Sequence, residues 1–88
     1  MKNKRIVLSR LFEKTFSRLP KEIRGSVYDK LELFLEDPSH PSLRIKKIKG
    51  SDYIWEMSVT MSYRITFQIR EAEIVLRKIG PHDILRKP

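Results

Sequence analysis

The segment 53–69 constrains the fold more than any other, because large apolar residues alternate with polar ones through two runs. This period of two is typical of β-strands with one buried face, and two such runs joined by a short turn predict a β-hairpin. The apolar residues are odd-numbered in both runs, so odd positions must pair with odd positions. A three-residue turn at 60–62 satisfies this condition. The predicted pairs are Val59 with Tyr63, Ser58 with Arg64, and Glu56 with Thr66.

The predicted hairpin has two different faces. The odd face, which includes Trp55 and Phe67, is a hydrophobic surface that another layer has to cover. The even face carries Arg64 among hydroxyl groups, an amide and the carboxylate of Glu56. We expect the even face to remain open and to hold the functional residues.

Two amphipathic helices are predicted ahead of the hairpin. A short β-branched strand at 5–8 leads into Ser9, which suits the N-cap of a helix over 10–19. Pro20 is expected at the first position of a second helix, and an Asp-Pro step ends that helix. Because only a tight corner separates them, the helices should form an antiparallel hairpin with their apolar sides on the odd face of the sheet.

Two further strands, at 43–49 and 74–79, complete the predicted sheet. The first carries many basic residues, and the second is apolar on both faces, as expected for a strand between two neighbours. The element order predicts an α+β fold. In this fold an N-terminal strand and a two-helix antiparallel hairpin accompany a twisted, mainly antiparallel sheet of four to five strands, with the helices packed on one face.

Length and composition limit the possible functions. With 88 residues, 40% of them hydrophobic, the chain is expected to form a single domain over 1–88. Cysteine is absent, which excludes disulfides and thiolate metal sites. The sequence has no membrane-spanning run and no signal peptide, so we expect a cytoplasmic protein without a membrane partner. The net charge of +8 favours a polyanionic partner, either a nucleic acid or an acidic protein.

Arg64 and His82 are the two candidates for chemistry. A mid-strand arginine can clamp a phosphate and stabilise charge that develops on it, although a cross-strand ion pair with Glu56 is an equally good reading. A histidine titrates near neutral pH and suits proton transfer to a leaving oxygen, whereas a single histidine near a C-terminus is more often an ordinary surface residue. With two histidines and no cysteine, neither a metal site nor a cofactor is expected.

Basic residues form a second group of candidates. A single lysine on an exposed strand serves solubility more often than function, but a cluster beside aromatic residues indicates phosphate contacts. The cluster comprises Arg44, Lys46, Lys47 and Lys49, followed later in the chain by Arg77, Lys78, Arg86 and Lys87.

Several short motifs occur in a specific order along the chain. They are LP at 19–20, DPSHPSL at 37–43, IKG at 48–50, WE at 55–56, YRITF at 63–67 and IGPHD at 79–83. Together they resemble the RelE/ParE superfamily of bacterial and archaeal toxins, nearest to its RelE, YafQ and HigB branch. The resemblance covers nearly the whole chain. It implies a small basic toxin, encoded beside an acidic antitoxin, with two helices on a twisted antiparallel sheet.

The resemblance also implies an activity, that of a ribosome-dependent mRNA endoribonuclease that inhibits translation. Attack of a ribose 2′-hydroxyl on the adjacent phosphate requires positioning, charge neutralisation and a proton for the leaving 5′-oxygen, without a metal. By position, Arg64 would act on the scissile phosphate and His82 would be the general acid. Lys46 takes the place of an acid or histidine of other members, and would act either as a neutral base or as electrostatic support. Arg86 takes the place of an aromatic residue.

The same resemblance implies partners. RNA would contact Arg44, Lys47, Lys49, Arg77 and Arg86. The partners would be the acidic antitoxin and the ribosome with its mRNA, and operator DNA would be bound only through the antitoxin. Two alternatives stay open: a ParE-like toxin that inhibits DNA gyrase by contact, and a basic co-repressor that binds DNA with its antitoxin. Arg64 and His82 favour the enzyme, whereas Lys46 and Arg86 favour the alternatives.

Overall fold

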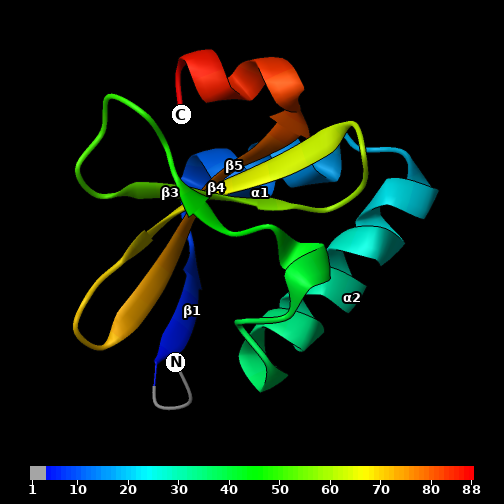
Figure 1. The fold of residues 1–88 in the computed structure, drawn as a ribbon. Coiled ribbons are helices and arrows are strands. Elements are labelled where there is room, and N and C mark those ends of the chain that lie inside the picture. Colours follow the sequence, from blue (N-terminus) through cyan, green and yellow to red (C-terminus); the bar gives the residue numbers. More distant parts are fainter. Residues whose placement is uncertain (1–3) are drawn as a thin grey trace.

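The computed structural model describes residues 4–88, which form a mixed sheet with helices packed on one face (Figure 1). The five strands lie in the order β1-β5-β4-β3-β2. Strand β1 is parallel to β5, and all other neighbours are antiparallel. This arrangement confirms the predicted α+β fold. The strands are β1 Arg5–Leu8, β2 Lys46–Lys47, β3 Ile54–Ser58, β4 Tyr63–Ile69 and β5 Glu73–Pro81.

The β3–β4 hairpin has the register that the alternating pattern predicted. Ser58 pairs with Arg64 and Glu56 with Thr66. At the turn, the amide of Val59 donates to the carbonyl of Tyr63 at 3.0 Å. The odd face is buried under the helices, and Met57, Ile65 and Phe67 are all 0% exposed.

The two helices begin where the sequence provides caps. Helix α1 spans Arg10–Ser17, and the hydroxyl of Ser9 accepts from the amide of Phe12 at 3.0 Å. Helix α2 spans Lys21–Glu36 with Pro20 as its N-cap, so it begins one residue later than predicted. The rings of Phe34 in α2 and Phe67 in β4 meet edge to face at 5.4 Å, which fixes α2 on the sheet.

Strand β2 is much shorter than the predicted strand at 43–49. Leu43 ends a short 3-10 helix, η1 Pro41–Leu43, and its side chain is fully buried in the core. Arg44 then adopts the left-handed conformation, with φ of 48°. Because the core anchors Leu43 and the backbone reverses at Arg44, the chain joins the sheet only at Lys46–Lys47.

The apolar pattern of β5 is explained by a bulge. Thr66 pairs with Lys78 and Phe67 with Leu76, so Arg77 is an extra residue between these pairs. The extra residue changes the alternation along the strand. It lets Ile74, Leu76 and Ile79 all enter the core, where each is at most 1% exposed.

The even face of the sheet is not open as predicted. The C-terminal 3-10 helix η2, His82–Arg86, folds back over it (Figure 1). The hydroxyl of Thr66 and the Nε of Arg77 both donate to the carbonyl of Pro88, at 3.2 and 3.1 Å. Thr66 is consequently 0% exposed, and Glu56 is only 7% exposed. No described helix is long and apolar enough to cross a membrane.

Candidate functional site

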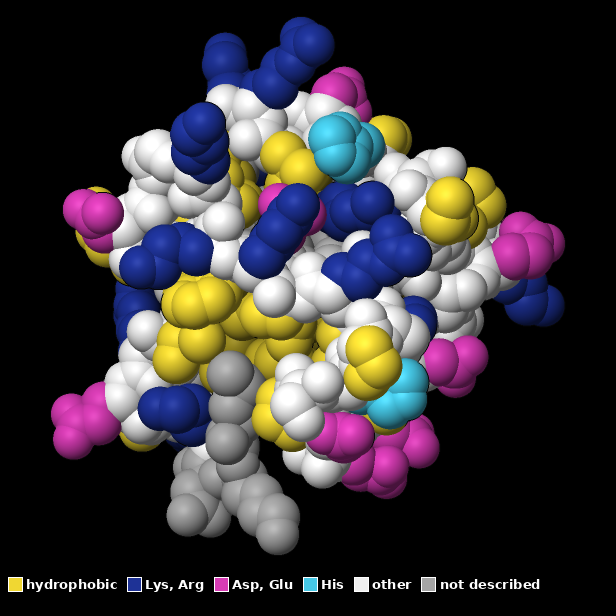
Figure 2. Space-filling view, viewed as in Figure 1, with side chains coloured by type: hydrophobic (Ala, Val, Ile, Leu, Met, Phe, Trp, Pro, Cys, Tyr) yellow, Lys and Arg dark blue, Asp and Glu magenta, His cyan; other side chains and the backbone are white. Residues whose placement is uncertain are grey.

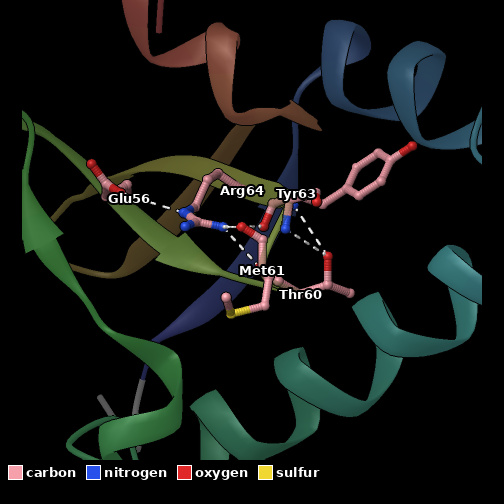
Figure 3. Close-up of polar contacts among 6 residues, drawn as sticks. Glu56, Thr60, Met61, Tyr63 and Arg64 are labelled. Atoms are coloured by element: carbon pink, nitrogen blue, oxygen red, sulfur yellow. Dashed lines mark hydrogen bonds and ion pairs between the residues drawn. The ribbon is translucent and has the colours of Figure 1, made fainter.

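Arg64 is largely buried beside the β3–β4 turn (Figure 3). Its Nη1 donates to the carbonyls of Thr60, Met61 and Tyr63 at 2.8, 3.0 and 3.1 Å. Its Nε lies 3.8 Å from Oε1 of Glu56, and its side chain is only 12% exposed. The ion pair that was the alternative reading of Arg64 is therefore present, and the same guanidinium also holds the turn together.

A row of four paired residues, three of them charged, crosses the even face next to Arg64. Lys46 in β2 pairs with Glu56 in β3, Glu56 pairs with Thr66 in β4, and Thr66 pairs with Lys78 in β5. Among the described residues, the cation within 4 Å of the Glu56 carboxylate is Arg64. Since a buried carboxylate is costly without opposite charge, Arg64 offsets part of the cost of burying Glu56.

His82 reaches the same turn from β5. Arg64 pairs with Gly80, and His82 follows two residues later as the first residue of η2. The amide of His82 donates to the carbonyl of Ser62 at 3.0 Å, and its side chain is exposed. One turn, residues 60–62, therefore connects the two residues that the motifs predicted for chemistry.

The predicted RNA-binding residues do not lie together. Lys47 pairs with Trp55, and its ammonium lies 5.6 Å from the centre of the Trp55 ring, on the side of β2 opposite Lys46. Arg77 is engaged with the carbonyl of Pro88. In the view of Figure 2, Lys and Arg side chains are grouped across the middle of the molecule, and most Asp and Glu side chains lie at the margin. Arg44, Lys49 and Arg86 are all exposed.

Trp55 is less buried than expected for a residue of the covered odd face. It is only partly buried, and Tyr53 is 63% exposed. Both residues belong to the end of the hairpin beside the short edge strand β2, whereas the fully buried aromatic ring of the sheet is Phe67.

A cleft beside the turn was not predicted. Lys30 of α2, Arg44, Ser58 and Thr60 line it. Lys30 lies at the edge of the apolar stripe of α2, three residues after Val27 and four before Phe34, and a single lysine at such an edge gives no distinct sequence signal. Within residues 4–88, no group of three or more His, Asp or Glu side chains is placed to hold a metal ion.

Comparisons with known proteins match the fold. No family model and no curated protein matches the sequence significantly. Among solved structures, RelE in the RelB-RelE complex of Methanococcus jannaschii is 22% identical, with a TM-score of 0.73 over 91% of this chain and 94% of that one. YafQ in the E. coli DinJ-YafQ complex is 12% identical, with a TM-score of 0.78 over 94% and 97%. A YoeB/ParE toxin from Agrobacterium tumefaciens is 12% identical, with a TM-score of 0.74 over 89% and 98%. This chain therefore has the same fold as these RelE, YafQ and YoeB/ParE toxins, which is the fold that its motifs indicated.

Proposed function

We propose that this protein is the toxin of a toxin-antitoxin system and that it cleaves mRNA on the ribosome. The observation that carries the proposal is the meeting of Arg64 and His82 at one turn, beside the row that contains Lys46. The fold shared with RelE, YafQ and YoeB toxins and the net charge of +8 support it.

The residues suit an in-line attack of a 2′-hydroxyl on the adjacent phosphate. The new P–O2′ bond forms as the P–O5′ bond breaks, which leaves a 2′,3′-cyclic phosphate. His82 donates a proton to the leaving 5′-oxygen, and the 2′-hydroxyl proton passes to solvent. Arg64 and Lys46 stabilise the charge that develops on the phosphate. Among the described residues, Nη2 of Arg64 has no hydrogen-bond partner, so it is the atom available to the phosphate.

An acidic antitoxin is the proposed protein partner. The structures of RelE and YafQ with similar folds are complexes with RelB and DinJ. For this chain, a partner with an excess of carboxylates would neutralise the basic even face, and operator DNA would be bound only through that partner.

A ParE-like inhibitor of DNA gyrase is the second candidate. The contacts of Arg64 with Glu56 and with the turn carbonyls favour it, because they give Arg64 a structural role that needs no catalysis. Induction of the protein in growing bacteria separates the two candidates. Cleaved mRNA with normal plasmid supercoiling supports the nuclease, whereas intact mRNA with altered supercoiling supports the gyrase inhibitor.

A further inference from the structure

A basic cleft of about 200 Å³ lies between α2, the segment after η1 and the β3–β4 turn. Its lining contains two cationic side chains, Lys30 and Arg44, and three hydroxyl side chains, Ser42, Ser58 and Thr60. None of the described residues that line it is acidic. Cations and hydroxyl donors without a carboxylate favour an anionic ligand.

Lys30 is held in position by a short chain of hydrogen bonds. Its ammonium donates to the hydroxyl of Ser42 at 3.1 Å. That hydroxyl lies 2.9 Å from Nδ1 of His40, which also accepts from the amide of Ser42 at 3.1 Å. The Ser42 hydroxyl therefore accepts from Lys30 and donates to His40. These hydrogen bonds use one of the three N–H donors of the Lys30 ammonium and leave two for a ligand.

Arg44 occupies a strained backbone position at the cleft. Within residues 4–88 it is the only residue other than glycine with a positive φ, at 48°. This conformation is costly for a residue with a long side chain and is tolerated by glycine. Strain of this kind concentrates at functional sites, and here the strained residue is one of those that line the cleft.

Ser58 adds a hydroxyl without a partner. The residue is only 7% exposed, yet among the described residues its side chain makes no hydrogen bond while it lines the cleft. No buried side-chain oxygen of the described residues lacks a hydrogen-bond partner, so the unbonded Ser58 hydroxyl is accessible from the cleft and available to a ligand there.

We propose that this cleft is a second phosphate subsite, which binds the phosphodiester next to the one at Arg64 on a single-stranded RNA. The proposal rests on the proposed function. Ser58 is the cross-strand partner of Arg64, and the guanidinium of Arg64 binds the carbonyls of Thr60 and Met61, which both line the cleft. The two anion sites therefore share the β3–β4 turn, whose contacts with Arg64 are drawn in Figure 3.

The test compares two short RNAs that cannot be cleaved because every 2′-hydroxyl is methylated. A trinucleotide has two phosphodiesters, whereas a dinucleotide has one and cannot occupy both sites. For the wild-type protein we expect the trinucleotide to bind about tenfold more tightly, since one charge-assisted contact of ~1.4 kcal/mol corresponds to a factor of ten. Lys30→Ala and Arg44→Gly should each bring this ratio close to one.

Lys21→Ala is the matched control, because Lys21 is an exposed lysine of the same helix that does not line the cleft. It should keep the wild-type ratio. Arg44→Gly should melt at or above the wild-type temperature, since glycine relieves the backbone strain, so its loss of binding is not a loss of folding. The subsite proposal is wrong if the wild type binds the two RNAs equally well. It is also wrong if both cleft variants keep the wild-type ratio of trinucleotide to dinucleotide affinity.

Ribosomal cleavage of mRNA is measured separately. If the wild type cleaves mRNA but the ratio does not depend on Lys30 and Arg44, the subsite is wrong and the nuclease stands. If the ratio depends on these residues but no mRNA is cleaved, the subsite stands as an RNA-binding site and the nuclease is wrong.

Discussion

Arg64 has a structural role that the sequence alone left undecided. The guanidinium neutralises the buried carboxylate of Glu56 and binds three turn carbonyls with one nitrogen. Burying a charge has a desolvation cost that an opposite charge offsets. Loss of either residue therefore leaves the other as an unpaired buried charge and destabilises the fold. A stability change is therefore expected for substitutions of Arg64 even if the protein has no catalytic activity.

A double-mutant cycle measures this ion pair. Arg64→Ala should lower the free energy of unfolding by about 2–3 kcal/mol, because it leaves Glu56 buried without its partner. In Arg64→Ala combined with Glu56→Gln, the second substitution removes the unpaired charge, so the combined loss should be smaller than the sum of the single losses. Urea denaturation gives the three values. Strictly additive losses would show that the 3.8 Å pair contributes nothing.

Two aromatic residues of the same sheet face should differ in their contribution to stability. Phe67 is 0% exposed and contacts Phe34, so Phe67→Ala should cost ~3–5 kcal/mol. Trp55 is only partly buried beside the edge strand, so Trp55→Ala should cost roughly 1–2 kcal/mol. Thermal and urea denaturation of both variants checks this order. A larger loss for Trp55→Ala would restore the central role that the sequence pattern suggested.

At the scale of the elements, the sequence was sufficient to predict helices and strands where the apolar and polar residues alternate over a long, uninterrupted stretch. The hairpin register followed from the odd-numbered turn, and Ser9 capped α1 as expected. The short length of β2 was not predictable, because it depends on Leu43 entering a core that distant residues build. The bulge at Arg77 was also not predictable from the sequence, because only the pairing of β5 with β4 shows that Arg77 is an extra residue.

The candidate site was also predicted only in part from the sequence. The motifs located Arg64 and His82, and the fold brings both to one turn. They did not locate the cleft, because its lining comes from α2, η1 and the turn, which are separate in the sequence. They also did not predict that η2 covers part of the even face. That depends on Gly80, whose missing side chain leaves room for Ile84.

The packing of η2 on the sheet can be tested at Gly80. A Cβ at this position would lie 2.8 Å from Cγ2 of Ile84, so Gly80→Ala should lower stability by about 1–3 kcal/mol through overpacking. Gly25→Ala is the control, because a Cβ there meets nothing within 4 Å, and it should raise stability by up to ~1 kcal/mol in the helix.

The double variant Gly80→Ala with Ile84→Ala identifies the contact responsible. It should recover part of the stability lost in Gly80→Ala, because the shortened side chain makes room for the new methyl group. No recovery would mean that the loss at Gly80 arises from the backbone rather than from η2.

At the scale of the whole molecule, the net charge of +8 dominates interactions with partners. Both proposed partners, RNA and an acidic antitoxin, are polyanions that bind such a surface with strong dependence on salt. The β3–β4 turn contributes Thr60 and Met61 to the cleft lining and also binds Arg64, so a partner that covers the turn would block both proposed sites.

Binding of the proposed acidic antitoxin should weaken as salt is added. Rim charges govern the association rate, so the rate constant for association should fall more than the rate constant for dissociation rises. Stopped-flow mixing at increasing ionic strength measures both. An association rate that is independent of salt would indicate a mainly apolar interface.

Primer extension on mRNA from a translating extract tests the central claim most directly. With the wild-type protein we expect discrete cuts within codons that disappear when ribosomes are omitted. His82→Ala should reduce the cleavage rate ~10²- to 10⁴-fold, the usual range for loss of a general acid, while its melting temperature stays close to that of the wild type because the side chain is exposed. Intact mRNA with the wild-type protein, or undiminished cleavage by folded His82→Ala, would contradict the account.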